Sequence, residues 1–294
     1  MVERMISKFA SARPHFLVGA YLFAVAAIIA GAATQTVAQT AAQNTESIPD
    51  LSLNGMSWGG ANGREFLPVP GSPPAVTVDP ENPYINNAIN RQTGQQQTYH
   101  IADLTNPNVM QWAKDLMKVD NDEVLAGKIA YMPGQSCKPW GTPAVLQSGG
   151  PFIIIQSPTE VVIIEEGERL ARHVYLNMPH SVNPKPSWYG ESVGHYEDGA
   201  LVIDTIGITT ETFVDFFRTP HTENLHVMER WQISPDGTEL DILITVDDPG
   251  TYYAPWQVMR HLERGEEELG ENICREGNFR LFDYGIPIDE APDF

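Results

Sequence analysis

The chain has 294 residues, of which 42% are hydrophobic and 9% aromatic, a composition typical of a globular protein with a sizeable core. Acidic residues outnumber basic ones by 38 to 18, which gives a formal net charge of −20 at pH 7. This excess of acid leaves no basic surface to neutralise a phosphate backbone and argues against a nucleic-acid partner.

The first 38 residues have the pattern of a secretory signal peptide. Three basic residues precede an apolar run at residues 16–33, and small residues of the kind that a signal peptidase reads follow up to Ala38. We therefore predict cleavage after Ala38 and a periplasmic or secreted protein without stable membrane insertion. An uncleaved membrane anchor is the alternative, because an apolar run of this length just suffices to span a bilayer.

Two cysteines, Cys137 and Cys274, would remain in the exported chain. In an oxidising compartment, two thiols more often form a disulfide than a metal or catalytic pair. We predict a Cys137–Cys274 disulfide that ties the start of the main domain to its end. Two separate buried thiols are the alternative.

Residues 39–104 are rich in Gly, Pro, Asn and Gln and lack helical or strand periodicity. We predict that they form an extended N-terminal arm lying against the domain. One helix is predicted from Asn106-Pro107 to about Lys118, since Asn is a favourable N-cap and Pro suits the first helical position. Its apolar face is predicted to carry Val109, Trp112, Ala113, Leu116 and Met117.

Strand patterns follow the helix, and together they predict a mainly β domain over residues 105–294. Sequential strands joined by short turns favour an antiparallel meander that closes as a lipocalin-like barrel or folds as a sandwich. Two hairpins have explicit turn chemistry, one at Asp198-Gly199 and the other at residues 234–237. The predicted strands and hairpins are Phe152–Gln156, Val161–Glu165, His173–Asn177, Val193–Thr205, Leu225–Val246 and Trp256–Leu262.

The first hairpin contains a candidate acid–base couple. Counting outward from its two-residue turn pairs Val193 with Asp204, so His195 and Asp204 lie on one face as diagonal neighbours. A carboxylate beside an imidazole fixes its tautomer and stabilises the imidazolium, as a general acid or base requires. A solvent-facing surface pair is the alternative.

A second cluster spans residues 220–230 and contains His221, His226, Glu229 and Arg230. Glu229 is the odd member of an otherwise apolar strand face. If buried, its carboxylate must be paired or protonated, because an isolated buried charge is too costly. We predict that Glu229 or His221 complements His195 as the second acid or base, or that Glu229 simply marks the mouth of a barrel.

The imidazoles and carboxylates of both clusters could also bind a metal, but their spacing matches no recognised site. We predict no organic cofactor, since the sequence contains no nucleotide-binding fingerprint, and leave a divalent metal as an alternative. Residues 190–194 fit the Gly-x-Ser-x-Gly nucleophile elbow, with Ser192, Asp204 and His221 in hydrolase order. A strand rather than a helix follows, which argues against a serine hydrolase.

Arg172, Trp188 and Tyr189 precede the first hairpin. If they line the opening of a barrel, the aromatic residues would form a wall for an apolar or aromatic ligand. We predict that they bind substrate together with His226 and Arg230. Packing of Trp188 and Tyr189 under the proline-rich loop is the alternative.

Three strings, Ser192–Gly207, Pro220–Arg230 and Val246–Trp256, together resemble a family of secreted bacterial proteins that are mostly described as hypothetical. The similarity covers about residues 105–276, with Cys137, Arg172, His180 and Cys274 inside it. Asp198-Gly199-Ala200 departs from the family's usual turn, and Tyr196 stands where a tryptophan is common. The resemblance supports the choice of residues and implies no named reaction.

These patterns predict an exported enzyme that acts on a small apolar or aromatic molecule by acid–base chemistry. His195, oriented by Asp204, would move the proton in a lyase, hydratase, isomerase or cyclase reaction. The alternative is a non-catalytic, lipocalin-like carrier whose cavity binds a small-molecule ligand. A metal-dependent enzyme or a hydrolase is a further alternative.

Overall fold

The structure is a computed structural model, and it describes residues 48–52, 57–59, 65–84, 100–126, 132–168, 171–265 and 269–270. The predicted signal peptide lies outside these residues, and so does Cys274, the predicted disulfide partner of Cys137. None of the helices in the described ranges has the length and apolar character that a membrane span requires.

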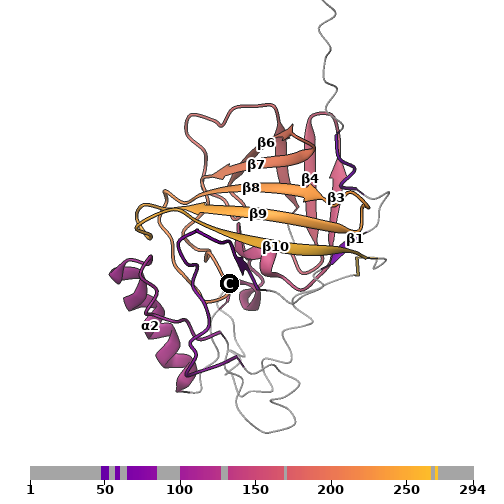
Figure 1. Ribbon diagram of the computed structural model, residues 1–294. Coiled ribbons are helices and arrows are strands. Elements are labelled where there is room, and N and C mark those ends of the chain that lie inside the picture. The colour runs from indigo at the N-terminus through magenta and orange to yellow at the C-terminus, as the bar shows by residue number, and fades with distance from the viewer. Residues whose placement is uncertain are drawn as a thin grey trace, which may run out of the picture. The chain divides into compact units, whose positions relative to one another are not determined.

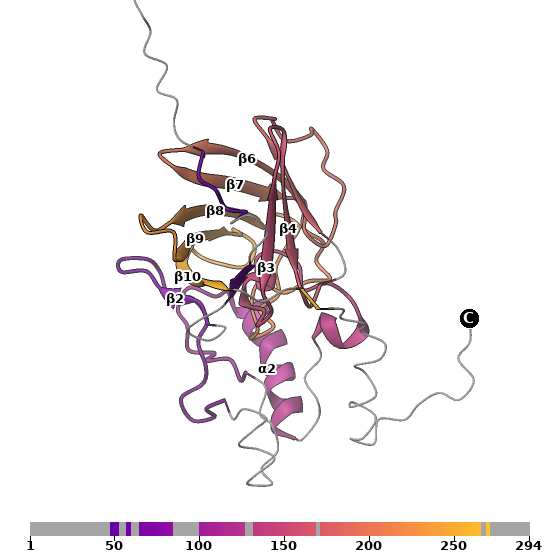
Figure 2. The same cartoon turned by 90° about the vertical axis from the view of Figure 1, so that its right-hand side faces the viewer.

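Nine strands in the described part of the chain close into a barrel, which confirms the prediction of a mainly β barrel fold (Figures 1 and 2). A further short strand, β2 (Leu67–Pro68), pairs with β10. In barrel order the strands are β1 (Ser57–Gly59), β3 (Phe152–Gln156), β4 (Glu160–Glu165), β5 (Arg172–Leu176), β6 (Glu191–Glu197), β7 (Ala200–Ile206), β8 (His226–Ile233), β9 (Glu239–Asp247) and β10 (Trp256–Gly265).

The barrel closes through β1, which pairs antiparallel with both β3 and β10. Trp58 anchors this strand, because its side chain is fully buried and its indole N–H donates to the Leu51 carbonyl at 2.8 Å. Part of the segment predicted as an extended arm therefore belongs to the barrel wall. A strand of three residues is too short to show the alternation that identifies strands in a sequence.

The predicted register of the first hairpin is confirmed. Val193 pairs with Asp204 and His195 with Val202 across β6 and β7. Asp198 and Gly199 form the turn with φ angles of 49° and 71°, as the two-residue turn of a twisted hairpin requires. The hairpin of β8 and β9 also forms as predicted.

One strand pair departs from the predicted antiparallel meander, because β5 and β6 run parallel. Parallel neighbours need a long crossover, and residues 177–190 provide it. This crossover contains three prolines, which lack the N–H that a ladder needs. Gly194 of β6 lies close to β5, since a Cβ there would come within 2.9 Å of Val174 Cγ1.

The predicted helix forms, but its bounds and its buried face differ from the prediction. Helix α2 spans Gln111–Leu125 rather than starting at Pro107, and its N-cap residue Met110 makes no capping side-chain bond. Asn106 instead donates to the Pro74 and Ala75 carbonyls at 3.1 and 2.8 Å. Of the predicted apolar face, Val109, Ala113 and Met117 are buried, whereas Trp112 and Leu116 are exposed.

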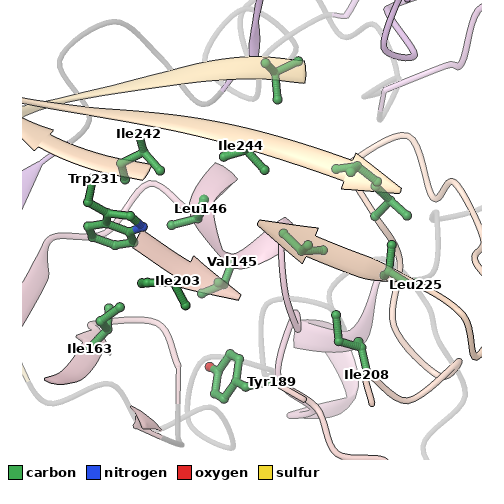
Figure 3. Packing of buried hydrophobic residues seen from close by; sticks show 14 of the residues in the cluster. Val145, Leu146, Ile163, Tyr189, Ile203, Ile208, Leu225, Trp231, Ile242 and Ile244 are labelled. Carbon is green, nitrogen blue, oxygen red and sulfur yellow. The ribbon is translucent and has the colours of Figure 1, made fainter. Parts of the chain in front are cut away.

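Side chains fill the barrel interior (Figure 3). Trp231, Ile242 and Ile244 point inward from β8 and β9, and Val145 and Leu146 join them from the short helix η3 (Ala144–Gln147). A second short helix, η2, spans Pro133–Ser136. The cavity beside η3 has a volume of only about 10 Å³, which is room for one water molecule. As far as the described residues show, the interior is therefore a packed core rather than a ligand chamber.

Candidate functional site

The four residues predicted to carry acid–base chemistry lie in three separate places. Glu229 faces the barrel interior and is 1% exposed. Asp204 and His195 share the outer face of the wall, since each alternates with inward-facing neighbours on its strand. His221 is buried in the loop before β8. The structure therefore does not bring these four side chains together on one cavity.

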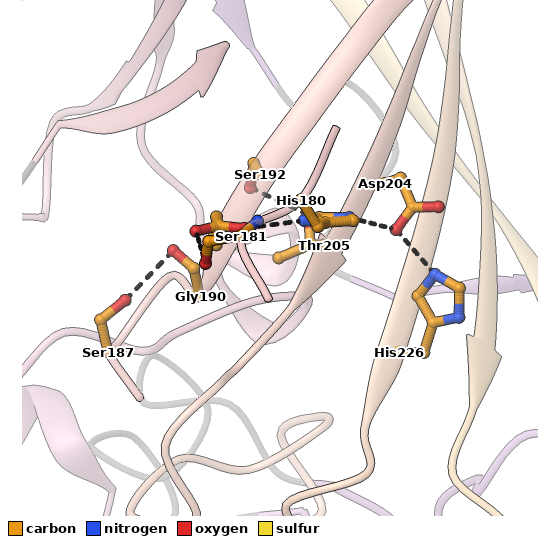
Figure 4. Close-up of polar contacts among 9 residues, drawn as sticks. His180, Ser181, Ser187, Gly190, Ser192, Asp204, Thr205 and His226 are labelled. Carbon is orange, nitrogen blue, oxygen red and sulfur yellow. Dashed lines mark hydrogen bonds and ion pairs between the residues drawn. The ribbon is translucent and has the colours of Figure 1, made fainter. Parts of the chain in front are cut away.

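His195 and Asp204 share a face as predicted, but each binds a different partner. The His195 Nε2 atom lies 3.1 Å from Glu197 Oε2, and its side chain is about half exposed. Asp204 Oδ1 instead lies 2.7 Å from His226 Nε2 and 2.9 Å from His180 Nε2, as Figure 4 shows. Asp204 therefore orients two other histidines.

We call His180, Glu191, Asp204 and His226 the outer cluster. Its hydrogen bonds tie the crossover to the wall, because His180 Nδ1 also lies 3.1 Å from Glu191 Oε1. The backbone N–H of Ser181 donates to the same carboxylate at 2.7 Å. In the described part of the chain, which includes the outer cluster, no three His, Cys, Asp or Glu side chains are arranged so that they could hold a metal ion.

Charge pairing sets the protonation of the outer cluster. The hydrogen bond from His226 lowers the pKa of Asp204, and the same bond raises the pKa of His226. Bonds from Ser181 lower the pKa of Glu191. These directions favour ionised carboxylates beside a protonated imidazole, as expected of an electrostatic anchor.

Glu229 and Arg172 form a buried ion pair inside the barrel. Arg172 Nη1 lies 2.9 and 3.0 Å from the two carboxylate oxygens, and the Trp231 indole N–H donates to Oε2 at 2.8 Å. Arg172 also donates to Ser192 Oγ at 3.2 Å and to Thr205 Oγ1 at 2.8 Å. The expectation that a buried Glu229 must be paired is confirmed, although its partner is an arginine.

The hydroxyl of Ser192 faces into the barrel, where it contacts Arg172 and Thr205 rather than a histidine. His221 lies elsewhere, with Nε2 at 2.8 Å from Thr212 Oγ1 and Nδ1 at 2.9 Å from the Thr222 carbonyl. Burial lowers the pKa of His221, so the imidazole is neutral near pH 7. The Gly-x-Ser-x-Gly match therefore lacks the geometry of a hydrolase triad.

The cavity beside η3, which we call the η3 cavity, brings two predicted residues together with one that sequence reasoning missed. Arg172 and Tyr189 line it with the carboxyl group of Glu165. Burial raises the pKa of Glu165, although hydrogen bonds from Ser148, Gly167 and Gly150 partly offset this effect. Tyr189 donates to Glu168, and burial raises the pKa of its phenol. Glu165 could have been found by the argument used for Glu229, because it shares a strand face with Val161 and Ile163.

The two remaining predicted binding residues lie apart from this cavity. Arg230 Nη2 donates to the Glu197 carbonyl at 3.1 Å on the outer side of the wall. Trp188 is partly buried, with Lys138 Nζ 5.5 Å from its ring centroid. Neither residue belongs to an aromatic wall around a cavity in the described part of the chain.

A larger pocket, which we call the β3–β4 pocket, lies where β3 and β5 end. Its volume is about 450 Å³, and residues 48–52 form one of its sides. Its inner surface is formed by inward-facing side chains at the ends of β3, β5 and β6, namely Gln156, Leu176 and Tyr196. The lining residues are Ile48, Pro49, Asp50, Ser52, Gln156, Ser157, Pro158, Leu176, Asn177 and Tyr196.

Gln156 holds the segment 48–52 against the barrel. Its Oε1 atom accepts the backbone N–H groups of Leu51 at 2.7 Å and Ser52 at 3.2 Å. Its Nε2 atom donates to the Pro49 carbonyl at 3.0 Å and to the Tyr196 hydroxyl at 2.7 Å. One amide side chain thus organises the side and the inner surface of the pocket.

Comparison with known proteins adds no family assignment to this geometry. No protein-family model, curated protein or solved structure matches the chain.

Proposed function

We propose that this protein binds a small, largely apolar molecule in the β3–β4 pocket and serves as an exported ligand carrier. The observation that carries the proposal is the volume of this pocket, about 450 Å³. Binding sites for small molecules usually enclose roughly 300–1,000 Å³ and combine apolar walls with a few placed polar groups. Ile48, Pro158 and Leu176 supply apolar surface here, and Gln156 and Tyr196 supply the polar groups.

The other parts of the barrel are less suitable as ligand-binding sites than the β3–β4 pocket. The η3 cavity has room for one water, and the remaining interior is filled by the core. The outer cluster is partly exposed on a barrel wall and serves as an anchor. An exported location fits the signal-peptide pattern of residues 1–38 and the predicted Cys137–Cys274 disulfide.

Blocking the pocket tests this function. Pro158 is exposed in the β3–β4 turn, and Pro158→Trp would place an indole in the pocket. We expect the wild-type chain to bind the neutral fluorescent probe N-phenylnaphthylamine saturably, one probe per chain. The variant should bind it about tenfold more weakly, a difference of roughly 1.4 kcal/mol.

Pro235→Trp is the matched control, because Pro235 is also an exposed turn proline after a serine but does not line the pocket. It should bind the probe as the wild type does. Absence of saturable binding by the wild type, or equal weakening in both variants, would contradict the proposal.

An acid–base enzyme is the second candidate, and Glu165 is the observation that favours it. Burial raises the pKa of this carboxyl group beside a cavity with room for one water, so Glu165 has the properties of a general acid that acts through a water molecule. We expect turnover by such an enzyme to be lost in Glu165→Gln. The measurement is mass spectrometry of a mixture of small apolar and aromatic molecules after incubation with wild type or variant. A product formed equally by both proteins would remove Glu165 from the chemistry.

A further inference from the structure

We infer that the β3–β4 pocket selects an uncharged, largely apolar molecule bearing an oxygen acceptor, and that the Tyr196 hydroxyl donates the selecting hydrogen bond. This inference rests on the proposed ligand-binding function and specifies the class of ligand. It follows from a count of donors and acceptors around Gln156 and from the charges that line the pocket.

Three backbone groups fix the orientation of the Gln156 amide. The N–H groups of Leu51 and Ser52 both point at one side-chain atom, which must therefore be the oxygen. The Pro49 carbonyl lies 3.0 Å from the other atom, which must be the nitrogen. A flipped amide would set donor against donor and acceptor against acceptor.

This orientation decides what the Tyr196 hydroxyl does. Gln156 Nε2 donates to the phenolic oxygen at 2.7 Å, so Tyr196 is the acceptor in that bond. A phenol has one O–H donor, and this donor meets no acceptor among the described residues. Because Tyr196 lines the pocket, the free O–H is available to a ligand.

The hydroxyl keeps its proton throughout the physiological range. Burial raises the pKa of Tyr196 above its ordinary value of 10. The group therefore donates to an acceptor and does not act as an anion. A carbonyl, ether or hydroxyl oxygen on the ligand supplies the matching acceptor.

The lining charges disfavour an anionic ligand. Among the described residues that line the pocket, Asp50 is the sole acidic one, and none is a lysine, arginine or histidine. Asp50 Oδ1 accepts bonds from the backbone N–H and hydroxyl of Ser52, which hold the carboxylate in place. A ligand carboxylate would enter an apolar pocket without a counter-charge and beside a like charge.

Three naphthalene probes of nearly the same shape separate these effects. Acetylnaphthalene offers a carbonyl acceptor, isopropenylnaphthalene replaces that oxygen by a CH₂ group, and naphthoate carries a negative charge. Titration calorimetry on the mature chain should rank the ketone about three- to tenfold tighter than the hydrocarbon, the range expected of one neutral hydrogen bond. Naphthoate should bind most weakly.

Tyr196→Phe removes the donor and keeps the ring. We expect it to lower the affinity for the ketone to that for the hydrocarbon. The affinity for the hydrocarbon should stay unchanged, which reports that the pocket is intact. Tyr175→Phe is the matched control, because Tyr175 is exposed on the outer side of β5, and it should preserve the wild-type ranking.

The outcomes separate this inference from the function on which it rests. If none of the probes binds the wild type, the ligand-binding function itself fails. If the ketone and the hydrocarbon bind equally, or if naphthoate binds most tightly, the function stands and the selection by Tyr196 is overturned. Loss of ketone affinity in both tyrosine variants would also overturn it.

Discussion

The Arg172–Glu229 pair shows what a sequence can and cannot say about one buried residue. The apolar neighbours of Glu229 on its strand face predict that its carboxylate needs a partner, and it has one. The sequence does not predict the identity of that partner, because Arg172 lies on β5 and contacts Glu229 across the barrel interior. Nothing near Glu229 in the sequence points to a residue 57 positions away.

Breaking this pair should be costly. Glu229→Ala leaves the buried guanidinium of Arg172 without its counter-charge, and we expect the free energy of unfolding to fall by about 3–5 kcal/mol. Urea denaturation followed by tryptophan fluorescence measures the loss. Glu197→Ala, at an exposed position on β6, should change stability by less than about 0.5 kcal/mol.

A double variant tests whether the loss comes from the uncompensated charge. Replacing the pair by Arg172→Met with Glu229→Leu removes both charges together, and we expect it to be more stable than Glu229→Ala alone. A double variant as unstable as the single one would mean that the surrounding hydroxyl and indole bonds, rather than the charge, hold this part of the core.

At the scale of elements, the crossover at 177–190 is attached to the barrel wall by ionisable groups. His180 bridges Glu191 and Asp204, and His226 shares Asp204 from β8. The bond to Asp204 raises the pKa of His226, so the protonated imidazole of His226 is the form that holds this shared carboxylate best. The hydrogen bond between His226 and Asp204 therefore depends on pH.

The pKa directions of His226 and Asp204 define the pH window in which their hydrogen bond holds β8 to β7. The raised pKa of His226 gives stabilisation that is complete below the unfolded value of 6.5 and is lost as pH rises through the folded value. The lowered pKa of Asp204 gives stabilisation that is complete above 3.8 and is lost as pH falls through its folded value. The hydrogen bond between His226 and Asp204 is thus strongest between pH 3.8 and pH 6.5, the pKa values of the two groups in the unfolded chain.

Amide hydrogen exchange, corrected for intrinsic rates, should therefore show greater protection of the start of β8, around His226, at pH 5.5 than at pH 8. Asp204→Ala should abolish this difference, because both histidines lose their shared acceptor. The β8–β9 turn at residues 234–238 is the internal reference, since it contains no histidine. Equal protection of the start of β8 at both pH values in the wild type would contradict this account.

The elements that the sequence predicted well are those fixed by local chemistry. The turn at Asp198-Gly199 set the register of β6 and β7, and the turn at residues 234–237 set that of β8 and β9. The helix was found but misplaced. Asn106 Oδ1 accepts the backbone N–H of Asn108 at 2.8 Å, as a capping side chain does, yet the helix begins only at Gln111.

At the scale of the whole molecule, the barrel class was predictable, but the way it closes was not. Closure depends on β1, which is too short to show a pattern, and on one parallel pair. The same limit applies to the β3–β4 pocket. Alternation puts Gln156 on the inward face of its strand with Phe152 and Ile154, yet its partners at residues 49–52 come from a segment without periodicity.

Closure by β1 also sets an order of events during biosynthesis. Ser57 of β1 is paired with Gly265 of β10. Both edges of β1 are therefore covered only after β10, the last strand of the barrel, has been synthesised. An emerging chain therefore exposes unpaired strand edges until Gly265 has been made. Contacts so distant in sequence also form slowly. On the export route that we propose for this chain, that delay lengthens the time in which a translocation machinery meets it unfolded.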